Sequence, residues 1–212
     1  MKHAIFYLAI TSLTFFSNCA GPKEPTGVWV NKEKFPSKSF DSVFIVVMTA
    51  DVEARAMLEN DLAIAATTRG YKAVKSIDVM PASLSDPKAP SREEITGKIK
   101  ETGCDAVLVA ALLKQEEAVN HNPGTTKGTL TPYYQQTYYG YYSNSHASVH
   151  TAGYYSQEKT YYMQTNLYDA ASEELMWTVQ STIFNPASLP KFSKSYTSTL
   201  VSQLAKQKVL KK

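Results

Sequence analysis

The sequence has little excess charge, few cysteines and no long apolar run. Its 22 basic residues face 19 acidic ones, so the formal net charge of this 212-residue chain is only +3. Nucleic-acid binders rely on a clustered basic face, which this balance does not support. Two cysteines cannot form a disulfide framework. A mean hydropathy of -0.27, with no apolar run near 20 residues, argues against a membrane-spanning protein. The sequence therefore predicts one globular domain with appendages.

Sequence motifs that carry catalysis or bind cofactors are also absent. No Gly-x-Ser-x-Gly elbow, Walker phosphate loop or dinucleotide fingerprint occurs. His146 and His150 have the spacing that zinc sites use on a helix, with His121 as a third candidate ligand. The Ser, Asn, Gly and Tyr residues around them disfavour a helix, and Ala147 stands where a zinc hydrolase has glutamate. The prediction is no metal, no cofactor and no enzymatic activity.

The first residues of the chain have the layout of an export signal. Met1, Lys2 and His3 form a short positive start. Residues 4–16 are a 13-residue apolar stretch interrupted only by Thr and Ser. That length suits the core of a signal peptide and is too short to span a bilayer.

The segment Phe16-Ser-Asn-Cys-Ala20 resembles a bacterial lipoprotein signal. The resemblance implies cleavage before Cys19, a diacylglycerol on its thiol and often an acyl group on the new amino terminus. Asn18 departs from the usual Gly or Ala, and Phe16 from the usual Leu. Because Ala20 is not Asp, the resemblance favours the outer membrane or the cell surface. A secretory signal cut elsewhere and an uncleaved anchor remain as alternatives.

These features divide the chain into residues 1–18 as signal peptide, 19–40 as a lipid-anchored tether and 41–212 as the folded domain. Two or three acyl chains hold a protein stably without a spanning helix. The tether contains three prolines, and we expect Trp29 and Phe35 within it to dock on the domain. Lipidation of Cys19 leaves Cys104 as the one free thiol, which we expect in the core.

Hydrophobic patterns predict an α/β domain with a mixed sheet, in two or three layers. In the first half, branched apolar runs alternate with helical patterns. Asp51 or Thr49 caps the first predicted helix, and Ser91 with Glu94 forms a capping box for the second. The predicted strands cover residues 43–48, 71–77 and 106–113, with helices that end before Gly70 and Gly103 and a loop over 78–90. This β-α-β-α-β order predicts parallel pairing by right-handed crossovers.

The second half is predicted to be antiparallel. Residues 158–168 alternate between apolar and polar side chains, and residues 175–183 do the same after a turn over 169–173. Pro186 and Pro190 are expected to break the chain before a final helix. The apolar stripe of that helix consists of Phe192, Tyr196, Leu200 and Leu204.

Three stretches of the chain resemble a group of small bacterial envelope lipoproteins. They are Gly103-Cys-Asp-Ala-Val-Leu-Val109, Asn166-Leu-Tyr-Asp169, and Ser172 with Leu175-Met-Trp177. The domain of that group is similar to the amino-terminal domain of the Tol-system translocation protein and to the curli-secretion lipoprotein. The likeness covers roughly residues 40–205 without the middle insertion. It implies a non-enzymatic assembly, secretion or regulatory accessory and transfers no catalytic residues.

A tyrosine-rich insertion over residues 121–157 is the most unusual feature. Residues 128–157 contain no charged side chain, and residues 133–168 hold 11 of the 14 tyrosines. Tyrosine combines a large ring with a hydroxyl, which suits recognition of sugars, peptides or protein surfaces. The candidate partner-binding residues are Tyr133, Tyr134, Tyr138, Tyr139, Tyr141, Tyr142, Tyr154 and Tyr155. A purely structural hairpin or loop, and self-association through an uncharged edge, are the alternatives.

The sequence thus favours a lipid-anchored cell-envelope protein that binds rather than catalyses. We expect an accessory subunit of an outer-membrane assembly or secretion system. Its expected partners are the membrane, through the anchor, and envelope proteins or further copies of the chain, but not nucleic acid. The alternatives are a periplasmic hydrolase with a site near the tyrosines and a self-assembling envelope scaffold.

Overall fold

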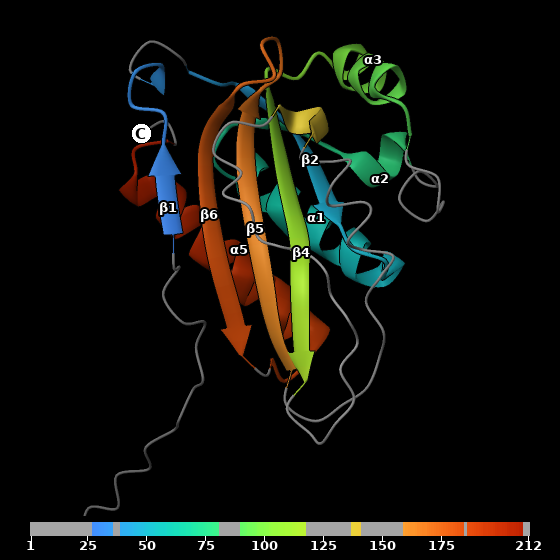
Figure 1. The fold of residues 1–212 in the computed structure, drawn as a ribbon, viewed down its shortest axis with the longest axis vertical. Coiled ribbons are helices and arrows are strands. Elements are labelled where there is room, and N and C mark those ends of the chain that lie inside the picture. The colour runs from blue at the N-terminus through green and yellow to red at the C-terminus, as the bar shows by residue number, and fades with distance from the viewer. Residues whose placement is uncertain are drawn as a thin grey trace, which may run out of the picture.

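The computed structural model describes residues 27–35, 39–80, 90–117, 137–140, 159–184 and 186–209. These residues form a mixed six-stranded sheet in the order β1-β6-β5-β4-β2-β3, with helices on both faces (Figure 1). The α/β class is confirmed, and the arrangement is the three-layer one. None of the described helices is both long enough and apolar enough to cross a bilayer.

The parallel half of the sheet follows the predicted order. Its elements are β2 (Ser42–Met48), α1 (Val52–Thr67), β3 (Lys72–Lys75), α2 (Ser76–Val79), α3 (Arg92–Thr102) and β4 (Ala106–Glu117). β2 pairs in parallel with both β3 and β4, so Val43 lies between Ala73 and Ala106. The predicted parallel crossovers are therefore confirmed.

The helix boundaries here are set by local capping. Asp51 accepts hydrogen bonds from the backbone nitrogens of Glu53 and Ala54 at the start of α1. Ser91 and Glu94 form the predicted capping box of α3, and Gly103 ends that helix in a left-handed conformation with φ of 66°. Such a conformation favours glycine because it lacks a Cβ atom.

The predicted end of one strand and the start of the loop after it were wrong. The strand expected over residues 71–77 ends at Lys75, and the chain then forms α2 rather than a loop. The cause is a long-range contact. The Glu59 carboxylate accepts hydrogen bonds from the Ser76 hydroxyl at 2.5 Å and the Ile77 backbone nitrogen at 2.8 Å, which turns the chain away from the sheet.

The antiparallel half consists of β4, β5 (Lys159–Asp169) and β6 (Leu175–Phe184), followed by α5 (Leu189–Lys206). β4 runs four residues beyond its predicted end at residue 113, because β5 pairs with it as far as Glu117. Pro190 does not precede the last helix but lies in its first turn. A helix tolerates proline there because first-turn N–H groups have no intrahelical acceptor.

Part of the predicted tether belongs to the sheet. Gly27–Val30 forms β1, which pairs antiparallel with β6 so that Gly27 lies opposite Gln180. Trp29 packs against the core on one face of the sheet, and Phe35 packs edge-on against Phe40 with ring centroids 6.1 Å apart. Docking of both aromatic residues is confirmed. The tether prediction was wrong for residues 27–30, because the open edge of β6 supplies backbone partners that a local pattern does not reveal.

The sheet separates two apolar cores. Helices α1 and α5 lie side by side over one face, behind the sheet in Figure 1. On the other face, Ile95 and Ile99 of α3 pack on β2 and β4. Cys104 is 7% exposed and belongs to this second core, as predicted.

Candidate functional site

Only two of the predicted partner-binding tyrosines lie in the described part of the chain. Tyr138 and Tyr139 lie on a short helical turn over residues 138–140, drawn in yellow in Figure 1 near α3. Cys19, the three candidate metal ligands His121, His146 and His150, and the tyrosines at 133, 134, 141, 142, 154 and 155 lie outside the described residues. The position of the turn locates residues 137–140 of the tyrosine-rich insertion on the fold.

Tyr138 attaches this turn to the sheet. Its side chain is only 2% exposed, and its ring meets that of Tyr168 on β5 edge-on, with centroids 6.3 Å apart and planes at 71°. Tyr139 packs partly buried against the same core. Of the two described candidates, Tyr138 therefore anchors the turn, while Tyr139 keeps part of its surface exposed.

A carboxylate in the β5–β6 hairpin pairs with an arginine at the start of α3. Glu173 has a positive φ of 59°, a conformation unusual for a residue with a side chain. Its Oε1 atom accepts a hydrogen bond from Nη2 of Arg92, at the start of α3, at 2.9 Å. Burial raises the pKa of Tyr138, the negative charge of Glu173 raises it further, and the positive charge of Arg92 opposes both. The ion pair therefore joins the hairpin to α3, and both of its charges act on the Tyr138 hydroxyl.

A buried polar network orients the ring on which Tyr138 rests. The Asn166 amide donates to the Tyr168 hydroxyl at 2.7 Å, and its Oδ1 atom accepts from Thr178 at 2.6 Å and from Gln164 at 3.2 Å. All four side chains are at most 4% exposed. Burial also raises the pKa of Tyr168. The network gives the face of β5 and β6 opposite α5 a fixed polar surface.

The stretches that carry the envelope-lipoprotein resemblance contribute directly to this region. Asn166 and Tyr168 belong to the polar network. Asp169 accepts hydrogen bonds from the backbone nitrogen and hydroxyl of Ser172, both at 2.8 Å, and so closes the turn that presents Glu173. These residues shape the hairpin and do not form a catalytic constellation.

A buried ion pair lies elsewhere, between α1 and α2, and sequence patterns did not reveal it. The Arg55 Nε atom lies 3.2 Å from Oε1 of Glu59, and the two side chains are 1% and 0% exposed. Arg55 also donates to the Ser76 hydroxyl at 3.0 Å and to the Met80 carbonyl at 3.1 Å. On a helix, an Arg and a Glu four residues apart are usually a solvated pair. Here their hydrogen bonds hold α2 in place.

Within the described segments, no group of three or more His, Cys, Asp or Glu side chains could hold a metal ion. The absence of a cofactor and of enzymatic activity stays a prediction, because the histidine-bearing part of the insertion lies outside these segments.

Comparison with known proteins yields structural likenesses only. No protein-family model matches the chain, and no curated protein matches it. A variant of PelC from Paraburkholderia phytofirmans, described as a dodecamer, is 11% identical over 77% of this chain and 87% of its own, with a TM-score of 0.41. A second PelC dodecamer has 11% identity, coverages of 73% and 80% and a TM-score of 0.39.

Lipoprotein GNA1162 from Neisseria meningitidis is 14% identical over 78% of this chain and 98% of its own, with a TM-score of 0.41. Scores near 0.4 at such identities assign neither a family nor an activity to the chain. The resemblance to the curli-secretion lipoprotein and to the Tol protein stays a prediction.

Proposed function

We propose that the chain is a lipid-anchored cell-envelope protein that acts by binding, as an accessory subunit of an outer-membrane assembly or secretion system. The observation that carries this proposal is the amino-terminal pattern: a positive start, a 13-residue apolar stretch and Cys19 directly after it. That combination suits export followed by acylation of a cysteine.

The position of β1 supports a short connection to the membrane. β1 begins at Gly27, eight residues after Cys19. Eight extended residues span at most about 29 Å. A lipid on Cys19 would therefore keep the domain within that distance of the membrane surface, where envelope partners are accessible.

The fixed surroundings of Tyr138 support binding rather than catalysis. Tyr138 packs against Tyr168, whose hydroxyl accepts a hydrogen bond from Asn166, and neighbouring Tyr139 is partly exposed. A rigid platform that presents tyrosines lowers the entropy lost on binding.

The anchor is tested by mass spectrometry of the membrane fraction. A diacylglyceryl mass on Cys19 is expected in the native chain and should vanish in Cys19→Ala. Cys104→Ala is the matched control, because Cys104 is a buried core residue and its loss should leave the lipid in place. A native chain that is unlipidated and cut elsewhere would contradict the anchor and remove the main support for the proposal.

The accessory role is tested by crosslinking in membranes. A photoreactive phenylalanine in place of Tyr139 should crosslink to an envelope protein or to a second copy. The same group at Lys194, which is exposed on α5, is the control for non-specific capture. If position 139 gives no more product than position 194, and the purified protein neither oligomerises nor retains a partner, the accessory role is wrong.

The self-assembling scaffold is favoured over an accessory only if the tyrosine segment itself joins the copies. In that case a chain without residues 128–157 should sediment as a monomer while the complete chain forms oligomers. Sedimentation velocity at several concentrations separates the two functions.

A further inference from the structure

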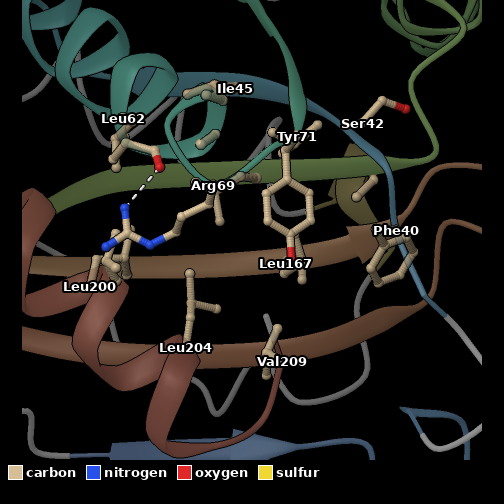
Figure 2. A pocket seen from close by; sticks show the side chains of 16 residues that line it. Phe40, Ser42, Ile45, Leu62, Arg69, Tyr71, Leu167, Leu200, Leu204 and Val209 are labelled. Atoms are coloured by element: carbon tan, nitrogen blue, oxygen red, sulfur yellow. Dashed lines mark hydrogen bonds between the residues drawn. The ribbon is translucent and has the colours of Figure 1, made fainter. Parts of the chain in front are cut away.

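A cleft opens between the C-terminal halves of α1 and α5, over the starts of β2 and β4 (Figure 2). Its cavity volume is about 70 Å³, and the empty space, open solvent included, is about 640 Å³. Phe40 and Leu167 line it on the sheet side, and Leu200 and Leu204 line it on α5. The interior is therefore almost wholly apolar.

The cleft exists because α1 carries small side chains where it faces this end of α5. Leu58 fills the core in the middle of α1 and is 2% exposed. Further along the helix, Leu62 lines the cleft together with the small side chains of Ala65 and Ala66. The apolar side chains that line the cleft lack dispersion contacts on the side that faces the empty space. An inserted apolar group would supply these contacts. The cleft is thus a receptive site for an apolar group.

The mouth of the cleft is positively charged. Among the described residues of the lining, Arg69 is the one that is charged, and it donates a hydrogen bond from Nη1 to the Ala65 carbonyl oxygen at 2.9 Å (Figure 2). Its other guanidinium N–H groups have no hydrogen-bond acceptor among the described residues. Lys206 and Lys208, at the end of α5, are exposed. An anionic group at the mouth would meet complementary charge.

Negative groups beside the cleft are already engaged. Asp105 accepts hydrogen bonds at 3.0 Å from both the backbone nitrogen and the hydroxyl of Ser42, which lines the cleft. At the end of α1, the Ala66 carbonyl accepts from the backbone nitrogens of Arg69 and Tyr71. These bonds occupy the carboxylate and the helix-end oxygens with donors of the chain itself, which leaves the guanidinium of Arg69 as the charged group that faces the cleft.

We propose that this cleft binds a fatty acid, with its carboxylate against Arg69 and its alkyl chain along the apolar walls. The cavity volume of about 70 Å³ accommodates only part of that chain. The remaining methylenes lie in the open space between the helices. The combination of apolar walls and one cationic mouth residue selects an anionic amphiphile over an uncharged one.

The test uses the chain from residue 19 with Cys19→Ala, so that no acyl chain of its own is present. Titration calorimetry with hexanoate, octanoate and decanoate should show affinity rising by up to about fourfold per methylene. Decanoate should bind more tightly than decanol. Because this chain carries no lipid, failure here leaves the proposed anchor intact and the two proposals stay distinguishable.

Two pairs of variants locate the binding. Ala66→Leu fills the cleft and should weaken decanoate binding more than tenfold without lowering the unfolding temperature, whereas Ala205→Leu, an exposed control on α5, should change nothing. Arg69→Gln should weaken decanoate several-fold and leave decanol unaffected, with Lys194→Gln as its control. If Ala66→Leu does not fold, Val201→Phe fills the cleft from α5 instead.

Three outcomes overturn the proposal. The first is no decanoate binding by the parent chain at millimolar concentration. The second is decanoate binding that survives in every cleft-filling variant. The third is capture of another occupant: anionic phospholipid vesicles, or a partner protein, that bind the parent chain while decanoate does not.

Discussion

Removing the buried carboxylate of Glu59 should destabilise the protein more than most single substitutions. The Oε1 atom accepts from the Val47 backbone nitrogen at 3.1 Å and from the Ser76 hydroxyl at 2.5 Å, and Oε2 accepts from the Ile77 backbone nitrogen at 2.8 Å. In Glu59→Leu these donors lose their acceptor, and the guanidinium of Arg55 is left without its counter-charge at 1% exposure.

Breaking a buried ion pair by removing one partner costs about 3–5 kcal/mol, and each orphaned donor adds to that cost. We therefore expect a loss of at least about 4 kcal/mol from the free energy of unfolding, and a fall of roughly 8–16 °C in the unfolding temperature. Urea denaturation followed by the fluorescence of buried Trp177 measures this loss of free energy. Glu101→Leu, at an exposed site on α3, is the control and should stay within about 0.5 kcal/mol of the parent chain.

The double variant Arg55→Met with Glu59→Leu decides whether the ion pair is the cause. The double variant has neither charge, so no buried guanidinium remains without a counter-charge. It should therefore be more stable than Glu59→Leu by at least about 1 kcal/mol. A loss below about 1 kcal/mol in Glu59→Leu, or no recovery in the double variant, would refute the reasoning.

Three further predictions concern the tyrosines and the glycines. Burial raises the pKa values of Tyr168 and Tyr196, so the folded protein retains protons that the unfolded chain releases. The free energy of unfolding should then be unaffected below about pH 10. Above that pH it should fall by about 2.7 kcal/mol per pH unit for the two tyrosines together. Urea denaturation that gives the same free energy at pH 10 and at pH 11 would contradict this prediction. Gly103→Ala should lower the free energy of unfolding by about 1 kcal/mol, because Gly103 has a φ of 66°. Gly97→Ala, inside α3, should instead stabilise the protein. Equal shifts of the unfolding temperature in the two variants would show that the left-handed conformation of Gly103 is unimportant. Tyr138→Leu removes the ring that packs edge-on against Tyr168 and should cost about 1 kcal/mol locally. Amide exchange over residues 137–140 should become roughly fivefold faster, and unchanged exchange would show that this ring does not anchor the turn.

Several elements were predictable because their causes are local. The branched apolar run over residues 43–48 predicts a buried strand from its own composition. Ser91 and Glu94 cap α3 through bonds within four residues, and Gly103 ends that helix through its own backbone freedom. The order of these elements then implied parallel pairing, which β2, β3 and β4 show.

The errors have long-range causes. Gly27–Val30 is a strand only because the edge of β6 is open beside it. Residues 76–79 form a helix because Glu59, 17 residues before Ser76, accepts their hydrogen bonds. The prediction that Pro190 breaks the chain before the last helix was wrong, because Pro190 lies in the first turn of that helix. N–H groups in a first turn have no intrahelical acceptor, so a proline there removes no hydrogen bond.

The α/β element order and the concentration of tyrosines are readable from neighbours a few residues apart, and the same local pattern predicts an export signal that ends at Cys19. Tertiary packing is what buries Tyr138 against Tyr168, places Arg55 in a buried ion pair and puts Ala66 beside a cleft. Such outcomes depend on which distant surface covers a side chain. A tyrosine or an arginine has the same local pattern whether water or another element of the fold lies against it.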